Sequence, residues 1–356
     1  MNTNSLGYIR NFDGLRAIAV LFVLLIHGSY GFFKGGWIGV DLFFVLSGFL
    51  ITTLLKNDYL NNKRISILKF YIRRFLRLLP ALILCIVLAY MLNMFSVAPK
   101  LNHNGFSSLA ALFYFNNVID IKVSGNLSHL WSLSVEEHFY LFWPLFLSYF
   151  FLRVSIKSQN WFIFSIIIAI TIIKIVCLRN NFVFQKGIFV IDTHRFTLFR
   201  IDSLLIGALV AMMSTKFNNT LKVYNKTAYD AILVVLGGVF TFLLFKLSID
   251  NIFYKNGGFF LINILCALLI FISAKIPDHF ILSNKLLCWI GTRSYGIYIY
   301  HFPIFMFFED IRIASSVFNF LLITFLRVVT TLLIAGISYS YVEKPFLNLK
   351  SRFSVR

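Results

Sequence analysis

Residues 11–27 read Asn11-Phe-Asp-Gly-Leu-Arg16-Ala-Ile-Ala-Val-Leu-Phe-Val-Leu-Leu-Ile-His27, an apolar run that predicts a first membrane-spanning helix. Arg16 and His27 lie eleven residues apart, which is about three helical turns, so both side chains face one side of the helix. Their separation along the helix axis is about 16 Å. Because ionisable groups inside a hydrocarbon layer are costly, such a pair usually indicates a functional site.

The composition is that of a membrane protein with many helices. The chain has 356 residues, of which 59% are hydrophobic and only 13% are charged, and its mean hydropathy is +0.82. The net charge of +19 is explained by lysines and arginines that keep loops on the cytoplasmic side of the membrane, so we expect no nucleic-acid partner. The four cysteines form no CxxC pair and show no metal-ligand spacing, so we expect no bound metal.

Apolar runs long enough to cross a bilayer predict about ten helices. They fall near residues 12–33, 38–55, 78–97, 131–152, 160–178, 197–213, 229–247, 257–274, 289–308 and 318–342. Residues 106–119 are too polar and too short for another span, so we expect a re-entrant or interfacial segment there. The sequence therefore predicts an all-α, polytopic bundle that forms one membrane domain over residues 1–356.

The distribution of basic residues predicts the orientation. Residues 56–77 contain seven lysines and arginines, and such a cluster is typical of a cytoplasmic loop. With ten spans, this places both termini in the cytoplasm.

Given this topology, the ionisable side chains fall into two layers. The inner layer holds Arg16, Arg73, Arg74 and Arg77, whose charge suits a phosphate-bearing ligand that enters from the cytoplasm. Five spans contribute to the outer layer, in which histidine and carboxylate groups together suit general base catalysis. Its members are His27, Asp41, Glu136, Glu137, Arg200, Asp202 and His301.

Each of these groups also has a plain structural explanation. His27 could be a buried histidine bonded to a backbone carbonyl, and Asp41 could cap the second helix. The three arginines of residues 73–77 could serve only as topology anchors. Arg200 and Asp202 could form structural ion pairs, whereas a carboxylate such as Glu136 inside a span demands a partner.

Several motifs, in this order, resemble the acyltransferase-3 family of integral membrane acyltransferases. The resemblance covers about residues 9–346. The motifs are Phe12-Asp-Gly-Leu-Arg16 with His27, Gly36-Trp-Ile-Gly-Val-Asp41-Leu-Phe-Phe-Val-Leu-Ser47-Gly-Phe49, Arg73-Arg74-Phe-Leu-Arg77-Leu-Leu-Pro80, Trp131-Ser-Leu-Ser-Val-Glu136-Glu137-His-Phe-Tyr140, Ser294-Tyr295 to His301, and Tyr341-Val-Glu343-Lys-Pro345.

The resemblance implies transfer of an acyl group, usually acetyl from acetyl-CoA, to a sugar hydroxyl of a bacterial surface polysaccharide. The acceptor would lie across the bacterial inner membrane, and lipopolysaccharide O-antigen is the one we favour. Two departures stand out. His138 replaces a more usual glutamine, and we expect no esterase-like domain, so the chain resembles the stand-alone members.

The resemblance also implies roles for particular residues. The family needs the residues matching His27 and Arg16, and it associates the arginines matching Arg73, Arg74 and Arg77 with the CoA side. We expect His27 to act as the base, oriented by Glu136 or Asp41, and direct transfer and a transient acyl-histidine both remain open. The residues expected to contact substrate are Trp131, Glu137, Tyr140, Arg200, Asp202 and His301.

Two other classes of protein compete with this interpretation. A proton-coupled transporter or flippase for a glycan or lipid could use the ionisable layer as a relay, although the sequence shows no inverted repeat. A non-enzymatic partner in a polysaccharide assembly complex would leave the histidine and glutamate layer unexplained.

Overall fold

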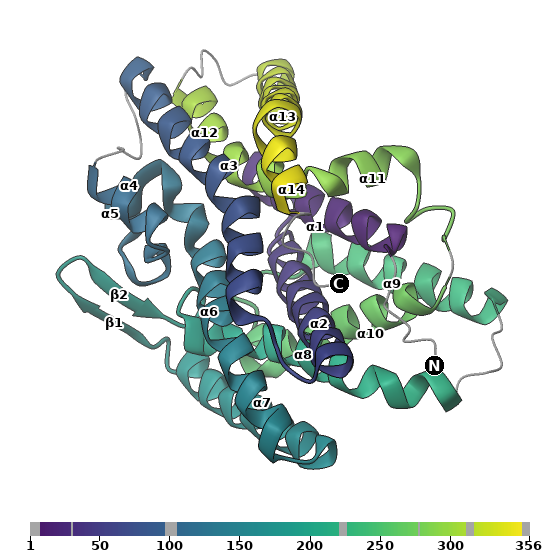
Figure 1. The fold of residues 1–356 in the computed structure, drawn as a ribbon. Helices are drawn as coiled ribbons and strands as arrows, with labels where there is room; N and C mark the ends of the chain where they lie inside the picture. The colour runs from purple at the N-terminus through teal and green to yellow at the C-terminus, as the bar shows by residue number, and fades with distance from the viewer. Residues whose placement is uncertain are drawn as a thin grey trace.

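The computed structural model describes residues 8–29, 31–96, 105–220, 226–276, 278–310 and 317–350, and it is a bundle of long helices (Figure 1). Ten of these helices match the ten predicted spans, which confirms the all-α fold. They are α1 (Arg10–Gly28), α2 (Ile38–Asn62), α3 (Ile67–Phe95), α6 (Trp131–Arg153), α7 (Ile156–Arg179), α8 (Thr197–Thr220), α9 (Lys226–Lys246), α10 (Phe259–Lys275), α12 (Ser294–Asp310) and α13 (Val317–Ser338). The chain ends whose cytoplasmic placement was predicted, before residue 8 and after residue 350, lie outside the described residues.

Within the described parts of the chain, eight of the ten are long and apolar enough to span a membrane. Of the other two, α12 has 17 residues and α6 has two glutamates and a histidine in its first turns. The chain is therefore a multi-pass membrane protein.

Shorter elements connect the spans. The segment predicted to be re-entrant or interfacial, residues 106–119, forms α4 (Gly105–Leu112) and the 3-10 helix η1 (Asn116–Val118), and α5 (Ile121–Ser124) follows it. All three helices are too short to cross a bilayer. The 3-10 helix η2 (Gly125–Leu130) then leads into α6. Helices α11 (Lys285–Thr292) and α14 (Lys344–Lys350), and the π-helices η3 (Tyr254–Gly258) and η4 (Tyr339–Glu343), complete the helical part.

The sequence did not predict a small antiparallel hairpin of β1 (Val183–Lys186) and β2 (Phe189–Asp192). It projects from the bundle beside α5 (Figure 1) and turns at Gly187, whose φ is 58°.

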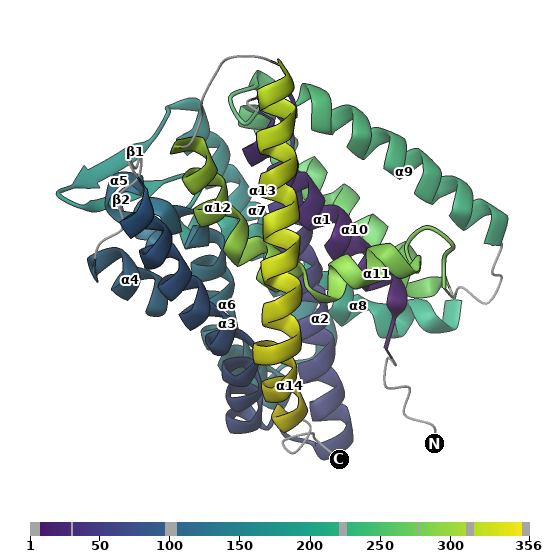
Figure 2. The ribbon, with the colours of Figure 1, turned by 90° about the horizontal axis from the view of Figure 1, so that it is seen from above.

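Helix α2 is the centre of the bundle, because 78% of its apolar window is buried, against 22% for α9 and 17% for the α13 segment. Figure 2 shows α9 at the edge of the bundle. Helix α8 packs closely along α2, and Gly48 makes this possible, since a Cβ atom there would lie 1.9 Å from the Leu204 carbonyl oxygen. The structure therefore holds α2 tightly against α8 at this position.

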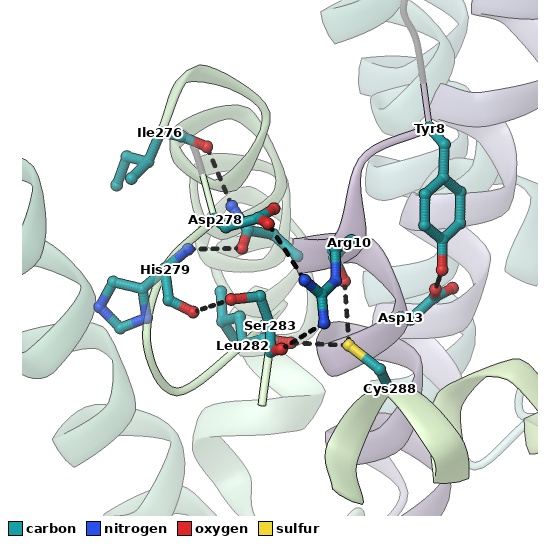
Figure 3. Close-up of polar contacts among 10 residues, drawn as sticks. Tyr8, Arg10, Asp13, Ile276, Asp278, His279, Leu282, Ser283 and Cys288 are labelled. Carbon is teal, nitrogen blue, oxygen red and sulfur yellow. Dashed lines mark hydrogen bonds and ion pairs between the residues drawn. The ribbon is translucent and has the colours of Figure 1, made fainter. Parts of the chain in front are cut away.

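The loop between α10 and α11 packs against the first turn of α1 and is hydrogen-bonded to it (Figure 3). Asn11 is buried, and its amide donates to the carbonyls of Ser273 and Ile276 at 3.0 Å each. Its side-chain oxygen accepts from the His279 backbone N–H at 2.9 Å. Gly14 allows the loop to approach, since a Cβ atom there would lie 2.1 Å from the Leu282 carbonyl oxygen.

Candidate active site

A cavity of about 700 Å³ lies between the helices and is lined by side chains of both predicted layers. That volume falls in the range of small-molecule sites. The lining comes mainly from α1, α2, α3, α6 and α12. Its polar members include Arg16, Ser47, Asp58, Arg73, Arg74, Arg77, Ser132, Glu136, Tyr140 and Tyr298.

One part of the cavity is strongly basic. The three predicted arginines of α3 are only partly exposed, and they are joined there by Arg16. The Arg74 guanidinium lies 4.3 Å from the centre of the Tyr140 ring, and Arg16 pairs with Asp13 at 2.6 Å. The structure thus brings all four arginines of the predicted inner layer to one cavity.

Three hydrogen bonds made by hydroxyl groups also lie in the cavity wall. Ser47 donates from Oγ to Glu136 Oε1 at 2.7 Å. The Tyr298 hydroxyl donates to the His129 carbonyl at 2.8 Å and lies 2.5 Å from Ser132 Oγ. Since the tyrosine proton goes to the carbonyl, Ser132 must donate to Tyr298.

Three histidines meet next to Tyr298. His27 Nδ1 lies 3.3 Å from His301 Nε2, and the His129 and His301 ring centres are 5.1 Å apart. The Tyr298 ring centre lies 5.7 Å from that of His129 and 5.5 Å from that of His301. Tyr298 therefore belongs both to the cavity wall and to the border of the histidine cluster (His27, His129 and His301).

The hydrogen bonds of the cluster assign a tautomer to its neutral rings. His27 Nδ1 lies 2.9 Å from the Val23 carbonyl, and because a carbonyl only accepts, the ring proton is on Nδ1. The Nε2 atom of His27 is then the basic one. His27 reaches the protein surface, whereas His129 and His301 are buried. A base that is oriented by a backbone carbonyl and open to an approaching hydroxyl fits general base catalysis.

His129 was missed as a site residue by the sequence analysis. Its Nε2 atom lies 3.0 Å from the Ile299 carbonyl, which leaves Nδ1 as its basic atom. It lies just before the fourth span, at the depth of the other outer groups. That position was the signal that could have identified it.

The carboxylates expected to orient His27 have other partners. Asp41 pairs with Arg200, and Glu136 accepts from Ser47. Among the described residues, the hydrogen-bond partners of His27 are Val23 and His301. The backbone carbonyl thus occupies the orienting position that was predicted for a carboxylate.

Arg200 and Asp202 lie in a buried ion-pair cluster with Asp41 and Lys174. The Lys174 ammonium lies 3.0 Å from Asp202 Oδ2, with both side chains fully buried, and above the Phe259 ring. The two pairs join α8 to α2 and to α7. This geometry matches the structural ion pairs that the sequence left open rather than a contact with a ligand in the cavity.

The remaining predicted substrate contacts are separated by the fold. Tyr140 lines the cavity and His301 lies in the histidine cluster. Trp131 packs against Phe44, and the Arg200 guanidinium lies 5.6 Å from its ring. Glu137 is partly buried, and within the described structure its Oε1 atom has no hydrogen-bond partner. Over the same residues, no group of three or more His, Cys, Asp or Glu side chains could hold a metal ion.

Comparison with known proteins agrees with this geometry. The model of an acyltransferase domain matches residues 9–339. The O-acetyltransferase OatA of Staphylococcus aureus (strain NCTC 8325) is 31% identical over 357 residues, which covers 95% of this chain and 57% of that protein. "Putative O-acetyltransferase SACOL0978" of Staphylococcus aureus (strain COL) is 33% identical over the same shares.

The chain thus spans a little over half the length of these relatives, and no solved structure matches it significantly. The family match covers nearly all the described helices, including those that form the cavity and the histidine cluster. The chain therefore belongs to the acyltransferase-3 family of membrane proteins.

Proposed function

We propose that this protein is an O-acetyltransferase of the bacterial cytoplasmic membrane. It moves an acetyl group from cytoplasmic acetyl-CoA to a sugar hydroxyl of a surface polysaccharide on the other side. O-antigen is the first acceptor to test, with capsule, exopolysaccharide and peptidoglycan sugars as alternatives.

One observation supports this function above the others, the contact between the basic cavity and the histidine cluster through Tyr298. An acyl transferase that uses two substrates from opposite sides needs a donor site and a base that meet at one point. Holding both reactants at that point removes much of the entropic cost of the reaction.

The donor would bind in the cavity. Acetyl-CoA carries several phosphates, and Arg16, Arg73, Arg74 and Arg77 offer guanidinium groups that bind phosphate oxygens in pairs. The thioester end would then lie near Ser132 and Tyr298, on the side of the histidine cluster.

The acceptor would approach His27. Its Nε2 atom would take the proton from the attacking sugar hydroxyl, while the Val23 carbonyl keeps the ring in the required tautomer. The buried rings of His129 and His301 support the orientation of His27 from the protein side.

The test of the chemistry is acetylation of the surface glycan in cells that express each variant at equal levels, measured by mass spectrometry. His27→Ala should lower acetylation at least about 100-fold, as expected for loss of a general base. His138→Gln is the matched control, because glutamine can keep the hydrogen bond to Thr197. Full acetylation with His27→Ala would reject the proposed mechanism.

The test of the donor site is acetyl-CoA affinity of the purified protein. Arg77→Ala should weaken binding about tenfold or more, because a charged contact contributes roughly 1.5–3 kcal/mol. Lys69→Ala removes an exposed charge from the same helix, outside the cavity lining, and should leave the affinity unchanged. Equal acetyl-CoA affinity for the wild type, Arg77→Ala and Lys69→Ala would mean that the arginines serve only to orient the chain in the membrane.

A further inference from the structure

Ser47 has an unusual hydrogen bond for a serine inside a helix. It lies in the middle of α2 and lines the cavity. Among the described residues, six other helical hydroxyls donate to the carbonyl four residues earlier, as such groups commonly do. They belong to Ser134, Ser165, Thr171, Thr241, Thr331 and Ser340. Ser47 instead donates across to Glu136 of α6, at 2.7 Å.

The surroundings fix this hydroxyl in place. The neighbouring Gly48 lies directly against the backbone of α8 at Leu204, so α2 cannot move closer to α8 at this point. A hydroxyl on a rigid helix, bonded to a carboxylate and facing a cavity, has the arrangement of an activated nucleophile.

The charge and position of the cavity suit an incoming thioester. Arg74 and Arg77 line the same cavity as Ser47 and place positive charge near Glu136. Tyr298 and Ser132 also line this cavity, and the Phe43 ring, one turn before Ser47, is 6.3 Å from the Tyr298 ring. Ser47 is therefore on the donor side of Tyr298, and the histidine cluster lies next to that tyrosine.

We propose that Ser47 is the first acceptor of the acetyl group, with Glu136 as its base, so that the reaction passes through an acetyl ester of Ser47. This inference rests on the proposed function and adds a covalent step to it. Such an ester would let CoA leave toward the cytoplasm before the sugar arrives from the other side.

The two steps balance. Ser47 Oγ attacks the thioester carbonyl, its proton moves to the Glu136 carboxylate, the C–S bond breaks, and the departing thiolate takes that proton to leave as CoA thiol. The sugar hydroxyl then attacks the ester carbonyl, His27 accepts its proton, and the C–Oγ bond breaks. The proton finally returns to Oγ, which regenerates the serine.

The test uses the purified full chain and radiolabelled acetyl-CoA with no acceptor. Without an acceptor the sugar step cannot run, and His27→Ala also removes the base that could activate water in its place. A covalent label should therefore accumulate in His27→Ala, and peptide mapping should place it on Ser47. Adding Ser47→Ala to His27→Ala should abolish the label. Adding Ser134→Ala instead removes a buried hydroxyl that bonds within its own helix, and the label should persist.

A third variant reports on the bond itself. Ser47→Cys combined with His27→Ala should give a thioester that neutral hydroxylamine releases, whereas the serine ester should resist the same treatment. This change of lability would not occur if Ser47 only held Glu136 in position.

Two results would overturn the inference while leaving the proposed function intact. One is acetylation of the glycan by Ser47→Ala at the wild-type rate. The other is a covalent label that is absent from His27→Ala or attached to a residue other than Ser47, while wild-type protein prepared in the same way acetylates the glycan. If the wild-type protein itself does not acetylate the glycan, the proposed function would instead be rejected.

Discussion

Replacing Lys174 by methionine tests whether the buried ion-pair cluster is structural. Methionine keeps the length of the side chain and its contact with the Phe259 ring, but it leaves Asp202 as a buried carboxylate without its ammonium partner. Removing one partner of a buried pair costs about 3–5 kcal/mol. We therefore expect the free energy of unfolding, measured by SDS titration in mixed micelles, to fall by about that amount.

The double variant Lys174→Met, Asp202→Leu separates charge from packing. It removes both charges and leaves the Asp41–Arg200 pair, so the cluster is neutral before and after the change. Replacing a whole buried pair by apolar groups is often close to neutral, so the double variant should recover most of the lost stability. Lys255→Met is the control, because its exposed hydrogen bond to Asn181 should contribute little.

The reasoning fails if the free energy of unfolding of Lys174→Met lies within about 1 kcal/mol of the wild-type value. It also fails if the double variant is no more stable than the single one. If instead the double variant is stable but no longer acetylates the glycan, the cluster has a direct role in function beyond structure.

Three further predictions concern the packing of α2 on α8, the hydrogen bonds of Asn11 and the dependence of stability on pH. Gly48→Ala should destabilise the protein by about 1–3 kcal/mol or more in the same SDS titration, because the new methyl group meets the Leu204 backbone; an unchanged stability would mean that α2 and α8 separate easily. Asn11→Ala should cost about 1–3 kcal/mol by leaving buried backbone groups without a partner, and Asn11→Asp should not restore the lost donor. Burial lowers the pKa of His194 to about 4 from 6.5, so stability should fall as the pH drops from 6.5 toward 4, where the unfolded chain binds the proton first. His194→Phe, which keeps the ring against Tyr254, should flatten this part of the pH profile.

The sequence predicted the helices well, because each span is a long apolar run with its own local signal. The hairpin of β1 and β2 was missed, since two four-residue strands between spans have almost no periodic signal. The segment predicted as re-entrant or interfacial forms two short helices, α4 and η1, and its limited length was the correct clue.

Partners between distant helices were harder to predict than the helices themselves. Asp41 and Arg200 are 159 residues apart, and depth alone placed both in the outer layer without showing that they pair. The same depth argument correctly grouped His27 with His301, because the end of α1 and the middle of α12 meet at that depth. Which carboxylate meets which histidine depends on helix rotation, and a single sequence does not determine helix rotation.

The cavity lies between two helix pairs that are each internally fixed. Helix α2 is tied to α8 by the Asp41–Arg200 pair and by Lys56, whose ammonium donates to the carbonyls of Ala211 and Met212 at 2.9 and 2.8 Å.

On the other side, α12 is tied to α3. The hydroxyls of Tyr295 and Tyr300 donate to the carbonyls of Leu78 and Ala81 at 2.8 and 3.2 Å. Glu136 and Ser132 project from α6 into the space between the two pairs. A site built this way holds Ser47 on one rigid wall and Tyr298 on the other, so the transfer distance depends on the spacing of the two pairs. Substitutions that loosen either pair should therefore lower the rate of transfer more than they lower acetyl-CoA affinity, since productive geometry is far more sensitive to small displacements than charge attraction is.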